Sequence, residues 1–124
     1  PDVIEGKFAE SGFIENIVVL GENQKHAGAI IVPDFAFLKT WCQKHEIEYT
    51  TPQEMIKNSE VKKRFAEEVK KINQNFGDTE KIKCYELIAD EWSVANGILT
   101  PTLKVKRSVV KEVYKDLIDK IYKD

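Results

Sequence analysis

Apolar and polar residues alternate along this chain with two different periods, and its N-terminal part shows both. Residues 2–11 carry apolar side chains at helical spacing and are followed by Gly12, which predicts a short helix. Two apolar, β-rich runs then occupy residues 17–20 and 29–32, on either side of a polar, glycine-containing connection. This arrangement predicts an antiparallel hairpin whose second strand ends at Pro33, because proline cannot donate a hydrogen bond to a sheet.

Helical spacing returns in the middle of the chain. Asp34 is a suitable N-cap for a helix that extends to about residue 45. A capping box with proline in the first turn, at residues 51–54, predicts a helical region that reaches Phe76 and is broken near Asn58. Residues 82–89 then have the apolar, β-rich character of a further strand.

The last third of the chain combines turns with a helix. The pairs Asn96-Gly97 and Thr100-Pro101 are turn signals within an irregular stretch, residues 92–106. From residue 109 to residue 122 the apolar positions follow the i, i+3, i+4, i+7 pattern, which predicts one amphipathic helix. This order of elements predicts an α+β domain, in which an antiparallel hairpin belongs to a small sheet flanked by helices.

Composition restricts the classes of protein. The 124 residues, 42% of them hydrophobic, suffice for the core of one domain. The mean hydropathy is -0.40, no apolar run is long enough to cross a membrane, and no charged-then-apolar leader opens the chain, so we expect a cytoplasmic protein. The net charge of -2 argues against general nucleic-acid binding. Because the chain opens with Pro1 and enters an amphipathic segment at once, we expect a piece of a longer protein.

Metal binding, redox chemistry and hydrolysis find little support in the sequence. Cys42 and Cys84 lie far apart without a CxxC partner, which predicts two reduced thiols. No nucleophile–base pair is evident around either cysteine, and His26 and His45 have no ligand partner at a metal-binding spacing. The sequence also contains no GxSxG, GxGxxG or Walker motif. We therefore expect no metal site and no nucleophile-plus-base catalysis.

Charged residues are distributed unevenly. The adjacent carboxylates Glu67-Glu68 and Asp90-Glu91 are expected on solvated faces and turns rather than as acid/base pairs. Residues 101–124 contain seven basic and four acidic side chains, a local excess of three positive charges. This excess draws attention to the turn-rich segment that precedes the last helix.

Residues 96–107 are the remaining candidate for chemistry. Gly97 and Pro101 predict a stiff turn, and the threonines on either side of Pro101 can satisfy backbone groups of the loop. Lys104 follows on a loop that is expected to project from the body, and an ammonium on a flexible stem suits phosphate or carboxylate oxygens. The residues alone leave two alternatives open: an anion-binding loop, or ordinary solvated charges before a helix.

Two stretches of the chain resemble a known family. Residues 11–35, SGFIENIVVLGENQKHAGAIIVPDF, are similar to the first hairpin of the C-terminal domain of long-chain acyl-CoA synthetases. Residues 97–107, GILTPTLKVKR, resemble the closing motif of the same subgroup, where the wider acyl-adenylate-forming superfamily has a Gly-Lys-x-x-Arg version. Residues 1–5 resemble the segment just after the inter-domain hinge, so the resemblance covers essentially the whole chain.

The resemblance implies that residues 1–124 are the mobile C-terminal lid domain of an AMP-forming long-chain fatty-acid–CoA ligase. The full-length enzyme would use ATP, Mg²⁺ and coenzyme A to convert a fatty acid into acyl-CoA, AMP and pyrophosphate. Lys104 matches the lysine of the closing motif and is implied to be catalytic, in contact with the fatty-acid carboxylate and the ATP or adenylate phosphate. The lid would then rotate for the thioester step. The N-terminal ATP- and acyl-binding domain lies outside this sequence, so the fragment alone is expected to bind none of these molecules and to be inactive.

The resemblance carries further expectations. Arg107 matches the arginine three residues after the lysine, and a packing or structural ion-pair role is expected for it. Leu103 stands where the wider superfamily has glycine, which leaves the shape of the loop open. The implied partners are the enzyme's own N-terminal domain and its substrates, with no nucleic acid; peripheral contact of the full-length enzyme with a membrane stays open. Two alternatives remain: another acyl-adenylate-forming enzyme, or a non-enzymatic α+β interaction module with a basic C-terminal segment.

Overall fold

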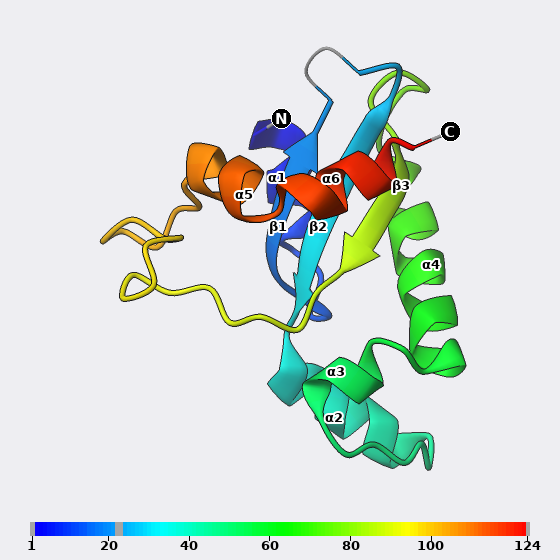
Figure 1. Cartoon of the computed structure of the whole chain (residues 1–124). Helices are drawn as coiled ribbons and strands as arrows, with labels where there is room; N and C mark the ends of the chain where they lie inside the picture. The colour runs from blue at the N-terminus through cyan, green and yellow to red at the C-terminus, as the bar shows by residue number, and fades with distance from the viewer. Residues whose placement is uncertain (1, 22–23, 124) are drawn as a thin grey trace.

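A three-stranded sheet forms the centre of the molecule. The computed structural model describes residues 2–21 and 24–123 (Figure 1). Its elements are, in chain order, α1 (Asp2–Phe8), β1 (Ile14–Leu20), β2 (Ala27–Pro33), α2 (Phe35–Lys44), α3 (Pro52–Met55), α4 (Ser59–Asn73), β3 (Ile82–Leu87), α5 (Arg107–Val113) and α6 (Lys115–Ile121). The strand order is β1-β2-β3. The hairpin β1–β2 is antiparallel and β3 joins β2 in parallel, so the sheet is mixed and the α+β prediction is confirmed.

Side chains from the two faces of the sheet enter two separate cores. Alternate residues of a strand point to opposite faces, so that Ile17 and Val19 of β1 enter one core while Val18 and Leu20 enter the other. All seven residues of β2, the central strand, are buried, which explains its uninterrupted apolar sequence. Helices α1, α2 and α4 supply the first core, whereas α5, α6 and the segment before them supply the second (Figure 1). The segment that contains Lys104 therefore belongs to the α5–α6 side of the sheet.

The helices of the middle segment begin where polar caps were predicted. The Asp34 carboxylate accepts a hydrogen bond from the Phe37 N–H at 3.1 Å, and the Thr51 hydroxyl accepts one from the Glu54 N–H at 3.1 Å. Asn58 caps α4 in the same way, which confirms the predicted break near this residue. Each cap satisfies a backbone donor that has no partner within its helix.

The predicted single C-terminal helix is wrong, because the chain forms two helices with a break at Tyr114. Tyr114 has φ -106° and ψ 25°, outside the helical region. Its hydroxyl is buried in the α5–α6-side core, where it accepts a hydrogen bond from Trp92 Nε1 at 2.9 Å and donates one to Asp90 Oδ2 at 2.8 Å. No proline or glycine marks this break, so the apolar periodicity runs through it without a signal.

Alkaline pH is expected to destabilise the chain through Tyr114. Burial, followed by the hydrogen bond to the Asp90 carboxylate, raises the pKa of Tyr114 to about 12, although the bond from Trp92 opposes this rise. An unfolded tyrosine loses its proton near pH 10, whereas the folded one keeps it, so the free energy of unfolding should fall as pH rises from about 10 to about 12. Urea unfolding at pH 9, 10 and 11 would measure this. The decrease should be smaller in Tyr114→Phe, and an equal decrease in both proteins would contradict the assignment.

Candidate functional site

A short ladder raises the Lys104 turn above the α5–α6-side core. Ile98 and Leu99 are buried and anchor the segment, and Val105 packs against the same core. Leu99 and Val105 form an antiparallel bridge, and the Lys106 N–H donates to the Ile98 carbonyl at 2.8 Å. The residues between these anchors, 100–104, are therefore held at their base while their tip projects from the body (Figure 1).

The tip is a hairpin loop of three residues, 101–103, closed by Thr100 and Lys104. The Leu103 N–H donates to the Thr100 carbonyl at 2.7 Å, and the Thr100 N–H donates to the Lys104 carbonyl at 2.8 Å. Pro101 occupies the second position of this turn, where its fixed φ is favourable. Leu103 has φ 67°, the left-handed conformation that ends a three-residue hairpin loop and is usually taken by glycine. Leu103 thus adopts the glycine-like conformation despite a cost of about 1–2 kcal/mol, which settles the shape of the loop.

A preceding turn, organised by Asn96, supports this loop. Asn96 Oδ1 accepts hydrogen bonds from the Ser93 N–H at 3.1 Å and the Ile98 N–H at 3.2 Å. Its amide nitrogen donates to the Glu91 carbonyl at 2.8 Å. Gly97 has φ 83°, so the turn predicted from the pair Asn96-Gly97 is confirmed and its glycine meets a conformational need.

The side chain of Lys104 is exposed at this tip. Within the described ranges, 2–21 and 24–123, no carboxylate lies within ion-pair distance of its ammonium group. Lys106, two residues after Lys104, is also exposed, but it is the N-cap residue of α5 and lies at the base of the loop. An exposed ammonium on a rigid turn can approach an anion bound to another body, where it would act as a point charge with three donors.

Arg107 has a different environment, although only two residues separate it from Lys104. Its Nη1 lies 2.5 Å from Glu5 Oε2, and its Nη2 donates to the Val19 carbonyl. Glu5 Oε2 also accepts a hydrogen bond from the Val19 N–H at 2.7 Å. The pair therefore ties the start of α5 to α1 and satisfies both backbone groups of Val19 on the edge strand β1. Of the two roles expected for Arg107, packing or a structural ion pair, the structure shows the ion pair.

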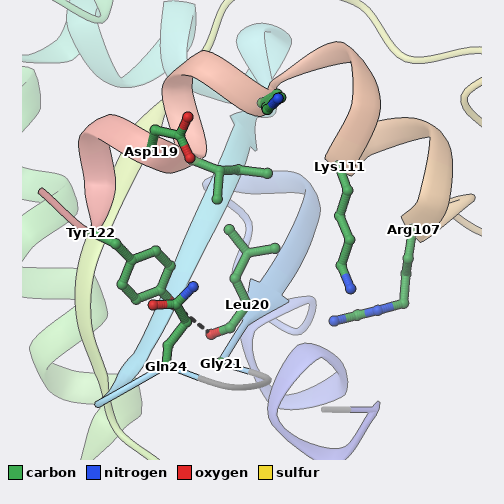
Figure 2. A pocket seen from close by; sticks show the side chains of 9 residues that line it. Leu20, Gly21, Gln24, Arg107, Lys111, Asp119 and Tyr122 are labelled. Carbon is green, nitrogen blue, oxygen red and sulfur yellow. Dashed lines mark hydrogen bonds between the residues drawn. The ribbon is translucent and has the colours of Figure 1, made fainter.

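A pocket of about 240 Å³ opens between the end of β1 and the helices α5 and α6 (Figure 2). Figure 2 shows Lys111 and Arg107 extending into it from α5, and Asp119 lies on α6. Lys104 does not line this pocket. Because the guanidinium of Arg107 is held by Glu5 and Val19, and Asp119 adds a negative charge, the pocket is not a purely cationic site.

The arrangement of elements and the closing segment agree with a known family over the whole chain. The model of the AMP-binding enzyme C-terminal domain matches residues 1–124. The chain belongs to this family.

Two curated relatives and one solved structure are similar to this AMP-binding enzyme C-terminal domain. Long-chain-fatty-acid–CoA ligase 6 of Homo sapiens is 34% identical over 125 residues, which cover 98% of this chain and 18% of the ligase. The chloroplastic long-chain-fatty-acid–[acyl-carrier-protein] ligase AEE15 of Arabidopsis thaliana is 29% identical, over 98% of this chain and 15% of that protein. The adenylation domain of a carboxylate reductase from Mycobacterium chelonae has the same fold, with a TM-score of 0.76 at 17% identity, over 99% of this chain and 18% of that one. The chain thus spans less than a fifth of these proteins.

The AMP-binding C-terminal domain contains one contact between a cysteine and a histidine that sequence spacing did not reveal. His26 Nε2 lies 3.3 Å from Cys84 Sγ, although 58 positions separate the two residues. Burial, and next the nearby Glu86 carboxylate, raise the pKa of the Cys84 thiol. A raised pKa disfavours the thiolate, so this contact has the character of a packed polar pair rather than an activated nucleophile. Among the described residues, no three His, Cys, Asp or Glu side chains form a group that could hold a metal ion.

Glu68 corrects the prediction that the Glu67-Glu68 pair lies on a solvated face. Glu68 is buried on α4, where the Ser11 hydroxyl donates to its Oε2 at 2.7 Å. Arg64 Nη2 lies 2.9 Å from Oε1, close enough for an ion pair but out of line for a hydrogen bond. The guanidinium of Arg64 also stands 4.5 Å above the ring of Phe13.

In the described part of the chain, no helix is long and apolar enough to cross a membrane.

Proposed function

We propose that residues 1–124 are the mobile C-terminal lid of a long-chain fatty-acid–CoA ligase and that Lys104 is its adenylation lysine. The observation that carries the proposal is the position of Lys104, exposed at the tip of a turn whose backbone is held by hydrogen bonds among Thr100, Leu103 and Lys104. Membership of the AMP-binding C-terminal domain family and 34% identity to a human long-chain-fatty-acid–CoA ligase support the class of reaction.

In the first step, a fatty-acid carboxylate oxygen attacks the α-phosphorus of ATP, and the bond to pyrophosphate breaks. Negative charge gathers on the α-phosphate oxygens and on the departing pyrophosphate during this displacement. The Lys104 ammonium, brought in by the lid, would donate to the carboxylate and α-phosphate oxygens where this charge develops. Such a contact accelerates the step because it is stronger in the transition state than with the free substrates.

In the second step, the thiol of coenzyme A attacks the acyl carbon of the adenylate, the bond to the AMP oxygen breaks, and the thiol proton passes to solvent or base. The lid would rotate between the steps, so that Lys104 withdraws and a different face of the domain meets the acceptor. Mg²⁺, when bound with ATP, offsets the charge of the phosphates. The described residues of this chain offer no cluster of metal ligands, so the groups that bind the ion would belong to ATP and the N-terminal domain.

Two other functions are alternatives to the ligase lid. The similarity to an acyl-carrier-protein ligase and to a carboxylate reductase domain favours the alternative of another acyl-adenylate-forming enzyme, which would transfer the acyl group to a different acceptor. The second alternative, a non-enzymatic module with a basic C-terminal segment, draws on the excess of basic residues after residue 101. In such a module the cations would contribute similar, salt-sensitive increments to binding.

The acceptor separates the first two possibilities. The full-length enzyme that carries this lid should show ATP–pyrophosphate exchange that depends on an added long-chain fatty acid. Addition of coenzyme A should then release AMP and form acyl-CoA, whereas a phosphopantetheinylated carrier protein should not replace it. Acid-dependent exchange with transfer to the carrier protein alone would replace the proposal by the carrier-protein alternative. Absence of acid-dependent exchange over short, medium and long acids would exclude all adenylating functions.

A further inference from the structure

One residue, Thr100, makes most of the hydrogen bonds that define the Lys104 turn, through its backbone and its side chain. Its hydroxyl oxygen accepts a hydrogen bond from the Lys104 N–H at 3.1 Å. Its backbone N–H donates to the Lys104 carbonyl at 2.8 Å, and its carbonyl accepts from the Leu103 N–H at 2.7 Å. Thr100 therefore binds both backbone polar groups of Lys104 as well as the donor of the residue before it.

The conformation of Leu103 makes this fixation necessary. Leu103 has φ 67°, which non-glycine residues adopt at a cost, and its side chain is 66% exposed, so packing contributes little to hold it there. Release of the turn would let Leu103 return to an extended or right-handed backbone. The path of the chain would then change at the residue from which the Lys104 side chain starts. The bonds to Thr100 are the contacts within the turn that oppose this change.

We propose that Thr100 is a positioning residue for Lys104: its hydroxyl fixes the backbone from which the ammonium reaches the reacting phosphate. This inference rests on the adenylation function proposed for Lys104. A lysine side chain has many rotamers, and a fixed starting point limits the volume that its ammonium can explore. The neighbouring Thr102 bonds to the Thr100 hydroxyl at 3.1 Å but makes no such bond to Lys104, so it offers a matched comparison.

The test uses the full-length enzyme with Thr100→Val, which removes the hydroxyl and keeps the branched shape. Loss of one hydrogen bond at the Lys104 N–H should lower the kcat of fatty-acid-dependent pyrophosphate exchange about tenfold, with KM for ATP and fatty acid changed less than about twofold. Thr100→Ser should restore most of the rate, because it returns the hydroxyl. Thr102→Val, at the neighbouring threonine of the same loop, should remain close to wild type.

The second half-reaction distinguishes positioning from a general structural defect. Each variant is also supplied with synthetic acyl-adenylate and coenzyme A, and the formation of acyl-CoA is measured. Thr100→Val should leave this rate near that of the wild type, since Lys104 is proposed to act only in adenylation. An equal loss in both half-reactions, a failure of Thr100→Ser to restore exchange, or an unchanged exchange rate in Thr100→Val would overturn the inference.

Failure of the positioning role differs from failure of the proposed function. If Lys104→Ala abolishes exchange while Thr100→Val does not affect it, only the role of Thr100 is refuted. If Lys104→Ala retains full exchange, the adenylation role of Lys104 fails, and the role of Thr100 fails with it. Leu103→Gly gives an independent check, because glycine accepts the left-handed conformation freely and should preserve the exchange rate.

Discussion

Replacement of Lys104 by alanine in the full-length enzyme is expected to lower fatty-acid-dependent pyrophosphate exchange by about 10²–10³-fold, the usual cost of removing one electrostatic contact to a transition state. The lysine side chain is exposed at the tip, and among the described residues it makes no ion pair or side-chain hydrogen bond. Its removal should therefore leave the stability of the domain nearly unchanged. The rate of acyl-CoA formation from synthetic acyl-adenylate should also stay close to that of the wild type.

Lys106→Ala is the matched control for this experiment. Lys106 carries the same charge two residues away and is also exposed, but it lies at the base of the loop, where α5 begins. Its replacement should change the exchange rate by less than about threefold, an effect expected from long-range charge alone. Similar small effects of both substitutions, each reduced by added salt, would contradict a specific role for Lys104 and favour the basic interaction module.

Much of the fold could be predicted because each signal was local. The caps at Asp34 and Thr51 need only a suitable side chain three residues before the N–H groups that they bind. The hairpin followed from two apolar runs around a polar connection, and burial on both faces explains why its second strand shows no alternation.

The features that sequence reasoning missed all depend on distant residues. The break at Tyr114 accompanies hydrogen bonds to Trp92 and Asp90, which lie more than twenty positions away. Glu68 is buried because Ser11, 57 positions before it, and Arg64 supply partners. The parallel pairing of β3 with β2 likewise has no local signal.

In the candidate site, too, the sequence did not predict the deciding contacts, although the residues that make them are close together in the chain. Turn chemistry predicted that the segment around Pro101 is stiff, but not which hydrogen bonds make it so. The left-handed conformation of Leu103 runs against its own preference, and only the bonds around Thr100 make it understandable. The proposal of Lys104 rather than Lys106 as the adenylation lysine rests on the resemblance of the motif, and no spacing argument would have separated the two.

Lys104 and Arg107 of the closing motif carry the same charge but lie in different environments. Lys104 is exposed at the tip of its turn and meets no carboxylate in the described part of the chain, so its charge could reach an anion outside this domain. Arg107 is directed inward and is held by Glu5 and Val19. We therefore expect removal of Lys104 to lower the reaction rate and removal of Arg107 to lower the stability.

Arg107→Ala is expected to lower the free energy of unfolding by about 2–3 kcal/mol, measured by urea denaturation. The substitution leaves the half-buried Glu5 carboxylate without its cation and the Val19 carbonyl without its side-chain donor, and each loss is worth about 1–3 kcal/mol when the group is shielded from water. Because both side chains are partly exposed to water, the total loss of stability should be smaller than the largest sum of these two losses. Arg107→Lys should recover only part of it, because an ammonium cannot reproduce the forked contact.

Hydrogen exchange at the Val19 amide provides the local readout that separates this mechanism from a loss of helix or charge. The Val19 N–H donates to Glu5 Oε2, whose orientation depends on Arg107, so its exchange should accelerate in Arg107→Ala more than exchange in the centre of β2. Lys106→Ala, which removes an exposed cation from the same turn, should change stability by less than about 0.5 kcal/mol and leave the Val19 amide protected. Equal destabilisation by both substitutions would mean that net charge near α5, rather than the link from α5 to the edge strand, determines stability. In that case α1 alone would protect the amides of the edge strand β1 from exchange.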